Sequence, residues 1–265
     1  MSKTLRFTLF ASLFVAAFSL IPISHAQSPF DGTWRLNPAT AKLTPKPFTT
    51  YTSQGWFHCV SCVPPYDVAA DGQDHAVSGH AYDTVSATLV DDHTIKFVYK
   101  KGGKITGDEL DSVSADGKIM TSVNSDYPAN GQVTHSTARL KRLGMPRPGV
   151  HATSGNWQVL NFTDTENDLL TTYVSKGDEL TMTDPTGDSY TAKFDGSDYP
   201  YKGSYGVNAV SLKRIDAHTF EETDKRDGTV VGVYKMTVSA NGKMMTIVAH
   251  DPRNDTSSTF TATKR

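Results

Sequence analysis

Short segments of alternating apolar and polar residues recur along the chain, and they predict β-strands. Clear examples are rich in β-branched and aromatic residues: 85–89 (VSATL), 95–99 (IKFVY), 119–123 (IMTSV) and 244–248 (MMTIV). Turn-forming pairs punctuate them, at Asp71-Gly72, Gly102-Gly103, Asp116-Gly117, Asp195-Gly196, Asp227-Gly228 and Asn241-Gly242. Beyond the first 26 residues, no window of a dozen residues carries a helical stripe. The pattern predicts an all-β protein of antiparallel hairpins.

The same pattern is written twice. Residues 91–126 and 216–251 match at a constant offset of 125, pairing for example Asp91 with Asp216 and Gly107 with Gly232. Upstream the offset becomes 124, and at the outer edges it is 123, where Gly32-x-Trp34 pairs with Gly155-x-Trp157. Loop insertions produce such small drifts, so we infer an internal duplication.

Two domains are therefore expected, at 28–143 and 151–265, joined by a linker at 144–150. The join, LGMPRPGVHATS, holds two prolines and two glycines and suits neither helix nor strand. Each copy has room for eight or nine strands. A sheet of many short strands usually closes into a barrel or folds into a sandwich, because either arrangement removes or shortens exposed edges.

The first 26 residues have the form of a secretory signal peptide. Lys3 and Arg6 precede an apolar run from Phe7 to Leu20, and the small residues Ser24 and Ala26 precede a cleavage point before Gln27. The run is too short to span a membrane, which takes about 20 residues. The sequence thus predicts a periplasmic or secreted protein without a membrane span.

The two ends of each copy favour a barrel over a sandwich. Each copy opens on Gly-x-Trp, with Trp34 or Trp157, and closes on a basic pair that ends at Arg142 or Arg265. In an up-and-down barrel the first and last strands are neighbours. We therefore expect Arg142 to stack on Trp34 and Arg265 on Trp157, each contributing roughly 0.5–2 kcal/mol.

A Gly-x-Trp opening with a basic residue at the close resembles the calycin group, which comprises lipocalins, fatty-acid-binding proteins and avidins. The tandem text DGTWRLN, ADGQDH, VSG, DDHT and VSADGK also resembles exported bacterial proteins described as lipocalin-like. The resemblance implies two lipocalin-like barrels, each a cup for a small, largely apolar ligand. Between these ends no further lipocalin motif is evident, so the identity of the ligand does not carry over.

Cys59 and Cys62 are the only cysteines, and the second copy has none at the matching positions. In an oxidising compartment a disulfide across a hairpin tip is the expected state. Redox catalysis is disfavoured, because a reactive CxxC needs its first cysteine at a helix N-terminus. A zinc site using His58 with either His75 or His80 has no recognised spacing, so no metal and no cofactor are predicted.

Aromatic residues gather in corresponding parts of the two copies, where an interior pocket could use them. The candidate ligand-binding residues are Phe48, Tyr51, Trp56, Tyr66, Tyr190 and Tyr201. His93 and His218 occupy equivalent positions before a strand, and a locally hydrogen-bonded turn explains them. Among the carboxylates nothing singles out a catalytic pair, although two can converge in space from anywhere in a sequence.

Composition narrows the function classes without naming a substrate. The chain has 265 residues, 26 Lys and Arg against 28 Asp and Glu, and no clustered basic face for nucleic acid. Nucleophile-elbow, zinc-protease and nucleotide-binding motifs are absent from the sequence.

The leading hypothesis is a non-enzymatic exported protein that binds a small apolar ligand or serves in the cell envelope. The alternatives are an interaction module with filled barrels, and a hydrolase or isomerase with its site inside the barrel. Oligomeric state is left open.

Overall fold

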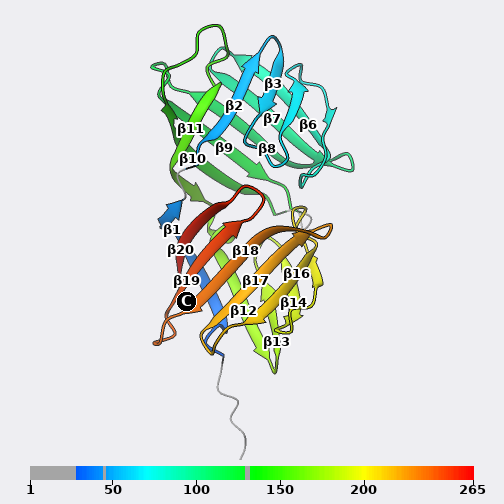
Figure 1. The fold of residues 1–265 in the computed structure, drawn as a ribbon, viewed down its shortest axis with the longest axis vertical. Coiled ribbons are helices and arrows are strands. Elements are labelled where there is room, and N and C mark those ends of the chain that lie inside the picture. The colour runs from blue at the N-terminus through cyan, green and yellow to red at the C-terminus, as the bar shows by residue number, and fades with distance from the viewer. Residues whose placement is uncertain (1–27, 44–45, 129–131) are drawn as a thin grey trace, which may run out of the picture.

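The computed structural model describes residues 28–43, 46–128 and 132–265, and nearly all regular structure in them is antiparallel β-strand (Figure 1). The first copy contributes β1 Gly32–Leu43, β2 Phe48–Ser53, β3 Trp56–Cys59, β4 Tyr66–Ala69, β5 His75–Ala76, β6 Thr84–Asp91, β7 Thr94–Lys101, β8 Lys104–Val113, β9 Ile119–Asp126 and β10 Thr134–Leu143. The second contributes β11 Gly155–Asp164, β12 Leu170–Lys176, β13 Glu179–Thr183, β14 Ser189–Lys193, β15 Tyr199–Lys202, β16 Ala209–Arg214, β17 Thr219–Arg226, β18 Thr229–Val238, β19 Met244–Asp251 and β20 Thr256–Lys264. A short 3-10 turn, η1 Glu166–Leu169, precedes β12. The predicted all-β class is confirmed, while the predicted signal peptide at 1–26 lies outside the described residues.

The strands form two ten-stranded barrel-like sheets, stacked along the long axis of the molecule (Figure 1). One is a closed barrel in the order β1-β12-β13-β14-β15-β16-β17-β18-β19-β20. The other runs β4-β3-β2-β11-β10-β9-β8-β7-β6-β5 and has β4 and β5 as its edges. The expected tandem architecture is thus present, although only the second copy's sheet closes by hydrogen bonds.

The two copies exchange their first strands. β1 pairs with β12 and β20 of the second copy, with Gly32 opposite Tyr173 and Trp34 opposite Lys264. In return β11 pairs with β2 and β10 of the first copy, with Gly155 opposite Thr50. Figure 1 shows blue β1 beside red β20 in one sheet and green β11 beside β2 in the other. Each sheet therefore holds nine strands of one copy and the first strand of the other.

The hydrogen-bonded units do not follow the predicted contiguous ranges. The ranges 28–143 and 151–265 remain a prediction for how the chain divides into copies. Strand pairing differs from them because β1 and β11 have changed places. The pattern within each strand gives no sign of this exchange, since the two first strands carry the same Gly-x-Trp motif and fit either sheet.

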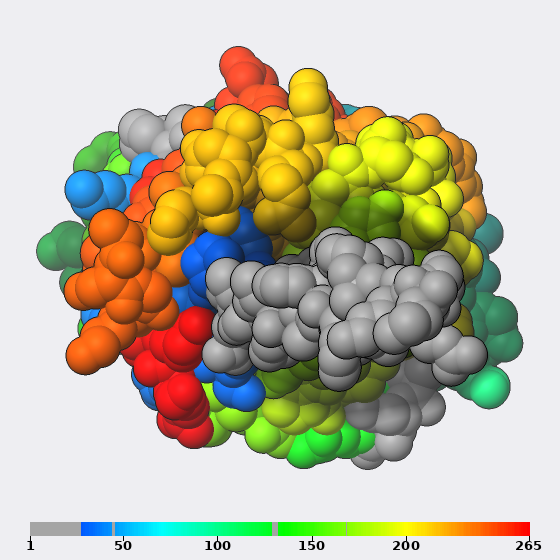
Figure 2. Space-filling view, turned by 90° about the horizontal axis from the view of Figure 1, so that it is seen from below, coloured from blue at the N-terminus to red at the C-terminus, as the bar shows by residue number. Residues whose placement is uncertain are grey.

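Each opening tryptophan is fixed by a hydrogen bond four residues back. The Trp34 indole N–H donates to the carbonyl of Phe30 at 2.7 Å, and the Trp157 indole donates to Thr153 at 2.9 Å. Phe30 is fully buried and packs edge-on against Phe220, with ring centroids 4.8 Å apart. Figure 2 looks onto this end of the molecule, where the blue N-terminal residues lie among red, orange and yellow segments of the second copy.

The tryptophans do meet closing cations, but not the predicted ones. The Arg142 guanidinium lies 4.1 Å from the ring centroid of Trp157, and the Lys264 ammonium lies 4.9 Å from that of Trp34. The predicted stacking of Arg142 on Trp34 and of Arg265 on Trp157 is therefore wrong. Strand exchange moves Arg142 to the other tryptophan. The ladder places Arg142 opposite Trp157 and Lys264 opposite Trp34, so Lys264 is the equivalent of Arg142. Arg265 instead forms an ion pair with Glu166.

Arg142 also ties together the loops at its end of the first sheet. Its guanidinium donates to the carbonyls of Gly117, Ala152 and Ser154. A Cβ on Gly155 would lie 2.5 Å from a guanidinium nitrogen of Arg142, and Gly155 has φ near +148°. The glycine of the Gly-x-Trp motif therefore makes room for the arginine that stacks on the tryptophan.

A proline stands next to the place where the first sheet stays open. In the second copy β14 and β15 pair through Ser189 opposite Lys202 and Tyr190 opposite Tyr201. Pro65 occupies the position of Ser189 at the offset of 124, and proline has no backbone N–H to donate. The corresponding strands β4 and β5 are left as the sheet edges.

The predicted disulfide is confirmed. Cys59 at the end of β3 is bonded to Cys62, with their Cα atoms 5.4 Å apart. Cys59 is 1% exposed and packs with Phe57, Val68 and Phe97 in the core of the first sheet. Within the described residues no helix is long and apolar enough to cross a membrane.

Candidate functional site

The closed barrel contains a cavity of about 300 Å³ that is partly open to solvent. Most of its wall is apolar, and the strands supply Leu36, Met182, Met236, Met245, Ile247 and Phe260. Four aromatic residues with polar atoms, Trp34, Tyr173, Tyr201 and Tyr234, also line it. Because the barrel is closed, alternate residues of every strand must point into this space.

Two carboxylates project into the cavity from β17. The strand alternates, so that buried Phe220, Glu222 and Asp224 share the inner face while Glu221 and Thr223 lie outside. Glu222 and Asp224 are each only 6% exposed, and both line the cavity. An acidic pair two residues apart on one strand thus becomes an adjacent pair inside an apolar chamber.

A hydrogen bond from Tyr190 links the pair to the barrel wall. The Tyr190 hydroxyl donates to Glu222 at 2.5 Å, and Glu222 and Asp224 lie next to each other on the inner face of β17. Burial raises the pKa of Glu222, and the neighbouring Asp224 charge raises it further. Burial likewise raises the pKa of Asp224. Two neighbouring buried carboxyl groups resist ionising together, which agrees with the raised pKa of both.

The pair has no cationic partner among the described residues. None of the ion pairs there involves Glu222 or Asp224. The Oδ1 atom of Asp224 is buried and has no hydrogen-bond partner. A buried carboxylate oxygen without a partner costs roughly 1–3 kcal/mol, so its position at a cavity wall needs an explanation.

The first sheet contains a second acidic pair, Glu109 and Asp111 on β8. The Tyr99 hydroxyl donates to Glu109 at 2.7 Å, and the Ser122 hydroxyl donates to the other oxygen of Glu109 at 2.8 Å. Burial, followed by the Glu109 charge, raises the pKa of Asp111, whose Oδ1 atom is buried and has no partner. Both carboxylates line a cavity of about 230 Å³.

The two acidic pairs do not occupy equivalent positions. At the offset of 125, Glu222 and Asp224 correspond to Phe97 and Tyr99, while Glu109 and Asp111 correspond to Tyr234 and Met236. The ladders place Phe97 opposite Glu109, and Glu222 opposite Tyr234. The acidic pair lies on β17 in the second copy and on β8 in the first, and the aromatic residues lie on the neighbouring strand in each case. Each sheet interior therefore keeps an acidic pair opposite an aromatic residue.

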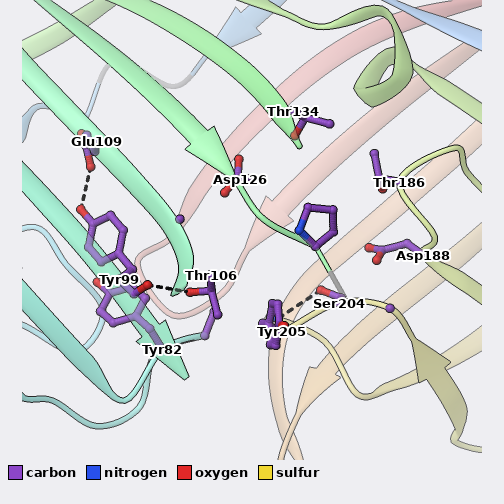
Figure 3. Close-up of a pocket in the computed structure, with 15 residues that line it drawn as sticks. Tyr82, Tyr99, Thr106, Glu109, Asp126, Thr134, Thr186, Asp188, Ser204 and Tyr205 are labelled. Carbon is purple, nitrogen blue, oxygen red and sulfur yellow. Dashed lines mark hydrogen bonds between the residues drawn. The ribbon is translucent and has the colours of Figure 1, made fainter. Parts of the chain in front are cut away.

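A third hollow, of about 520 Å³, lies between the two sheets. Figure 3 shows Tyr82, Tyr99, Thr106 and Glu109 of the first copy on one side, and Thr186, Asp188, Ser204 and Tyr205 of the second on the other. Tyr82, Tyr99 and Glu109 also line the interior cavity of the first sheet, so that cavity adjoins the cleft. Burial and the Asp184 charge raise the pKa of Asp188 to about 6.

Four of the six candidate ligand-binding residues lie inside the sheets. Phe48 and Tyr66 line the cavity of the first sheet, and Tyr201 lines that of the closed barrel. Tyr190 is buried and holds Glu222. Whether any of them binds a ligand stays a prediction.

The other two candidates, Tyr51 and Trp56, lie on the outer face, which corrects their assignment to an interior pocket. Trp56 is 49% exposed, and the ring of Tyr51 stacks under the Arg147 guanidinium at 4.5 Å. The alternation along β3 turns Phe57 inward and its neighbour Trp56 outward. An aromatic cluster in the sequence thus mixes both faces of the sheet.

The histidines hold local positions. His93 and His218 each lie in the turn just before a strand, and their backbone N–H groups donate to Asp91 and Asp216 at 2.8 Å, as expected of turn residues. His58 contacts Asp67 and His75 contacts Asp71. No group of three or more His, Cys, Asp or Glu able to hold a metal ion occurs in the part of the chain that the structure describes.

Sequence reasoning missed the acidic pairs, although a signal was available. In 219–226, TFEETDKR, the apolar Phe220 marks the inner face, and a period of two places Glu222 and Asp224 on that face. Acidic residues at both positions suggest a solvent-exposed strand face, unless Phe220 is used first to identify that face as the inner one.

Comparison with protein-family models and with curated proteins finds no match for the chain. The lipocalin-like resemblance therefore rests on the sequence motifs and on the barrel-like sheets alone.

Proposed function

We propose that the protein is an exported, lipocalin-like binding protein whose closed barrel holds a small, largely apolar ligand in its interior. The observation that carries the proposal is the cavity of about 300 Å³ walled by side chains of the closed barrel. Ligand sites in proteins begin at about this volume and combine an apolar wall with a few polar groups. The disulfide supports an oxidising compartment, and the signal-like N-terminal sequence supports export.

Binding of an uncharged dye tests the proposal. We expect N-phenylnaphthylamine to bind the purified protein at one site per chain with a marked rise in fluorescence. Ala262→Phe should abolish binding, because Ala262 is 2% exposed and lines the cavity. Fluorescence titration with each variant measures the effect.

The matched control is Thr263→Phe, which adds the same ring to the exposed neighbouring position of β20 and should bind the dye like wild type. Circular dichroism establishes that each variant is folded, and Ile247→Trp fills the same cavity should Ala262→Phe fail to fold. Equal dye binding by a folded cavity-filled variant would place the site elsewhere and refute the proposal.

A hydrolase or isomerase is the second candidate, and the buried acidic pair is the observation that favours it. Raised carboxyl pKa values of Glu222 and Asp224 would let one group donate a proton while the other accepts one near neutral pH. A solvent-shielded carboxylate is also a stronger base than one in water.

Proton abstraction from nitrobenzisoxazole tests this second candidate. When a carboxylate removes its ring proton, the N–O bond breaks and a nitrile and a phenolate form, which absorbance follows. If the pair acts as a base, wild type should open the ring at least about tenfold faster than the Glu222→Gln/Asp224→Asn variant. Equal rates would leave the protein with binding alone.

A further inference from the structure

The carboxylates of the closed barrel carry an inference about the class of ligand, which rests on the proposed function. The cavity is lined by three acidic residues, Asp184, Glu222 and Asp224, and by no basic residue, and apart from Thr171 the rest of its wall is apolar or aromatic. We infer that the ligand of the closed barrel is an organic cation, an apolar molecule carrying one ammonium group, held by Glu222 and Asp224 against the surrounding aromatic rings.

The free oxygen of Asp224 is the first support. Asp224 is 94% buried, since its exposed fraction is 6%, yet its Oδ1 atom has no partner in the described residues. The Tyr190 hydroxyl already satisfies an oxygen of Glu222. The unmet hydrogen-bonding capacity of the site is therefore an acceptor at the cavity wall, and an ammonium group supplies donors.

Aromatic rings around the same space are the second support. Tyr173, Tyr201 and Tyr234 line the same cavity as the pair, from β12, β15 and β18. Ammonium groups bind favourably over aromatic faces, contributing about 2 kcal/mol when desolvated. An apolar chamber with carboxylates at one place and aromatic rings around it matches a cation with a hydrocarbon body.

The duplicated site is the third support. Glu109 and Asp111 repeat the arrangement in the first sheet although they stand on β8, the neighbour of the equivalent strand. A carboxylate left over from the ancestral unit would keep its position in both copies. Here the acidic pair lies on different strands in the two copies, yet in both it faces an aromatic residue. This indicates that an acidic interior was retained in both copies after the duplication.

The titratable groups around the pair are either carboxyl groups, which add negative charge, or tyrosines, which are uncharged near neutral pH. These groups are Tyr173, Tyr190, Tyr201 and Tyr234, with Asp184 and Asp188 at the turn between β13 and β14. The nearby Arg253 is paired with Asp251. A bound ammonium would thus be the only cation at the pair, and its binding should release a proton from the carboxyl groups.

Two probes of nearly equal shape test the inference by displacement of the dye. Phenethylamine is protonated near pH 8, whereas phenethyl alcohol is neutral at every pH used. We expect the amine to displace N-phenylnaphthylamine at a concentration at least about tenfold lower than the alcohol. Amine affinity should rise about tenfold from pH 6 to pH 8, because the pair then loses its proton more readily.

Variants separate the acidic pair from the barrel as a whole. Asp224→Asn should bring amine and alcohol within about threefold of each other, and Glu222→Gln repeats the test if that variant does not fold. Glu221→Gln is the matched control, since Glu221 lies on the outer face of the same strand opposite Lys213 and Lys235, and it should keep the wild-type preference.

Calorimetry of amine binding in two buffers with different heats of ionisation gives an independent readout in wild type. A proton released on binding makes the measured enthalpies differ, and binding of the alcohol should show no such difference. Equal displacement by both probes, or failure of the amine to displace a bound dye, would overturn the inference while leaving the binding function intact. Absence of dye binding would instead remove the proposed function, and the inference with it.

Discussion

Replacing Trp34 with alanine is expected to destabilise the sheet of the second copy, although Trp34 belongs to the first. Trp34 is 2% exposed, sits in the core of the closed barrel and packs beneath Lys264. Removing so large a buried side chain should lower the free energy of unfolding of that barrel by about 3–5 kcal/mol. Hydrogen exchange measured by mass spectrometry should show lost protection in β12 and β20 and preserved protection in β7 to β9.

Two controls make this result specific for strand exchange. Trp157→Ala should produce the mirror image, with protection lost in β2 and β10, because Trp157 is fully buried in the sheet of the first copy. Trp56→Ala should change stability by less than about 0.5 kcal/mol, since Trp56 is largely exposed. Loss of protection in β7 to β9 on replacing Trp34 would mean that each first strand belongs to its own copy.

The buried acidic pair should make the protein less stable as the pH rises. Burial raises the pKa of both Glu222 and Asp224 in the folded state, so the folded protein holds protons that the unfolded chain gives up near pH 4. The unfolding free energy should therefore fall from about pH 5 to about pH 9, as the pair is forced to ionise inside the barrel. Glu222→Gln/Asp224→Asn should be more stable than wild type at about pH 9, by on the order of 3 kcal/mol.

Urea denaturation at several pH values measures this difference. Near pH 5 the variant and wild type should be nearly equal, because amides match protonated carboxyl groups in shape and hydrogen bonding. Glu221→Gln should track wild type throughout, since its carboxylate lies on the outer face of β17. A stability difference between the double variant and wild type that does not change with pH would show that the pair stays ionised when folded.

Local chemistry explains which parts of the fold could be predicted. The β-branched alternation in β7 and β9 and the glycine-containing turns set the strands and their antiparallel order, because both signals act within a few residues. The disulfide was predictable from two cysteines three positions apart in a chain whose N-terminal sequence resembles a signal peptide.

Strand exchange could not be read from the sequence, because β1 and β11 carry interchangeable motifs. The prediction of which basic residue stacks on each tryptophan was wrong for a simpler reason. Matching Lys141-Arg142 with Lys264-Arg265 is one residue out of register, and one residue in a strand turns a side chain to the other face. Buried Leu140 and Ala262, which mark the inner face in both closing strands, give the correct alignment.

Predicting the candidate site also depends on knowing which face of the sheet each side chain occupies. Tyr66 and Tyr201 were identified because aromatic residues suit a pocket wall, yet Trp56 was misplaced by the same criterion. The acidic pairs escaped notice because acidic residues usually lie at surfaces, and only the closed geometry of the barrel makes Glu222 and Asp224 interior.

The exchanged strands set the order in which the protein can mature. β1 leaves the ribosome before any other strand, but its partners are β12 and the C-terminal β20. Until β20 has been synthesised, the second barrel cannot close, and its apolar interior is open along unpaired strand edges. The pairing of β1 with β20 is therefore the last step in closing this barrel.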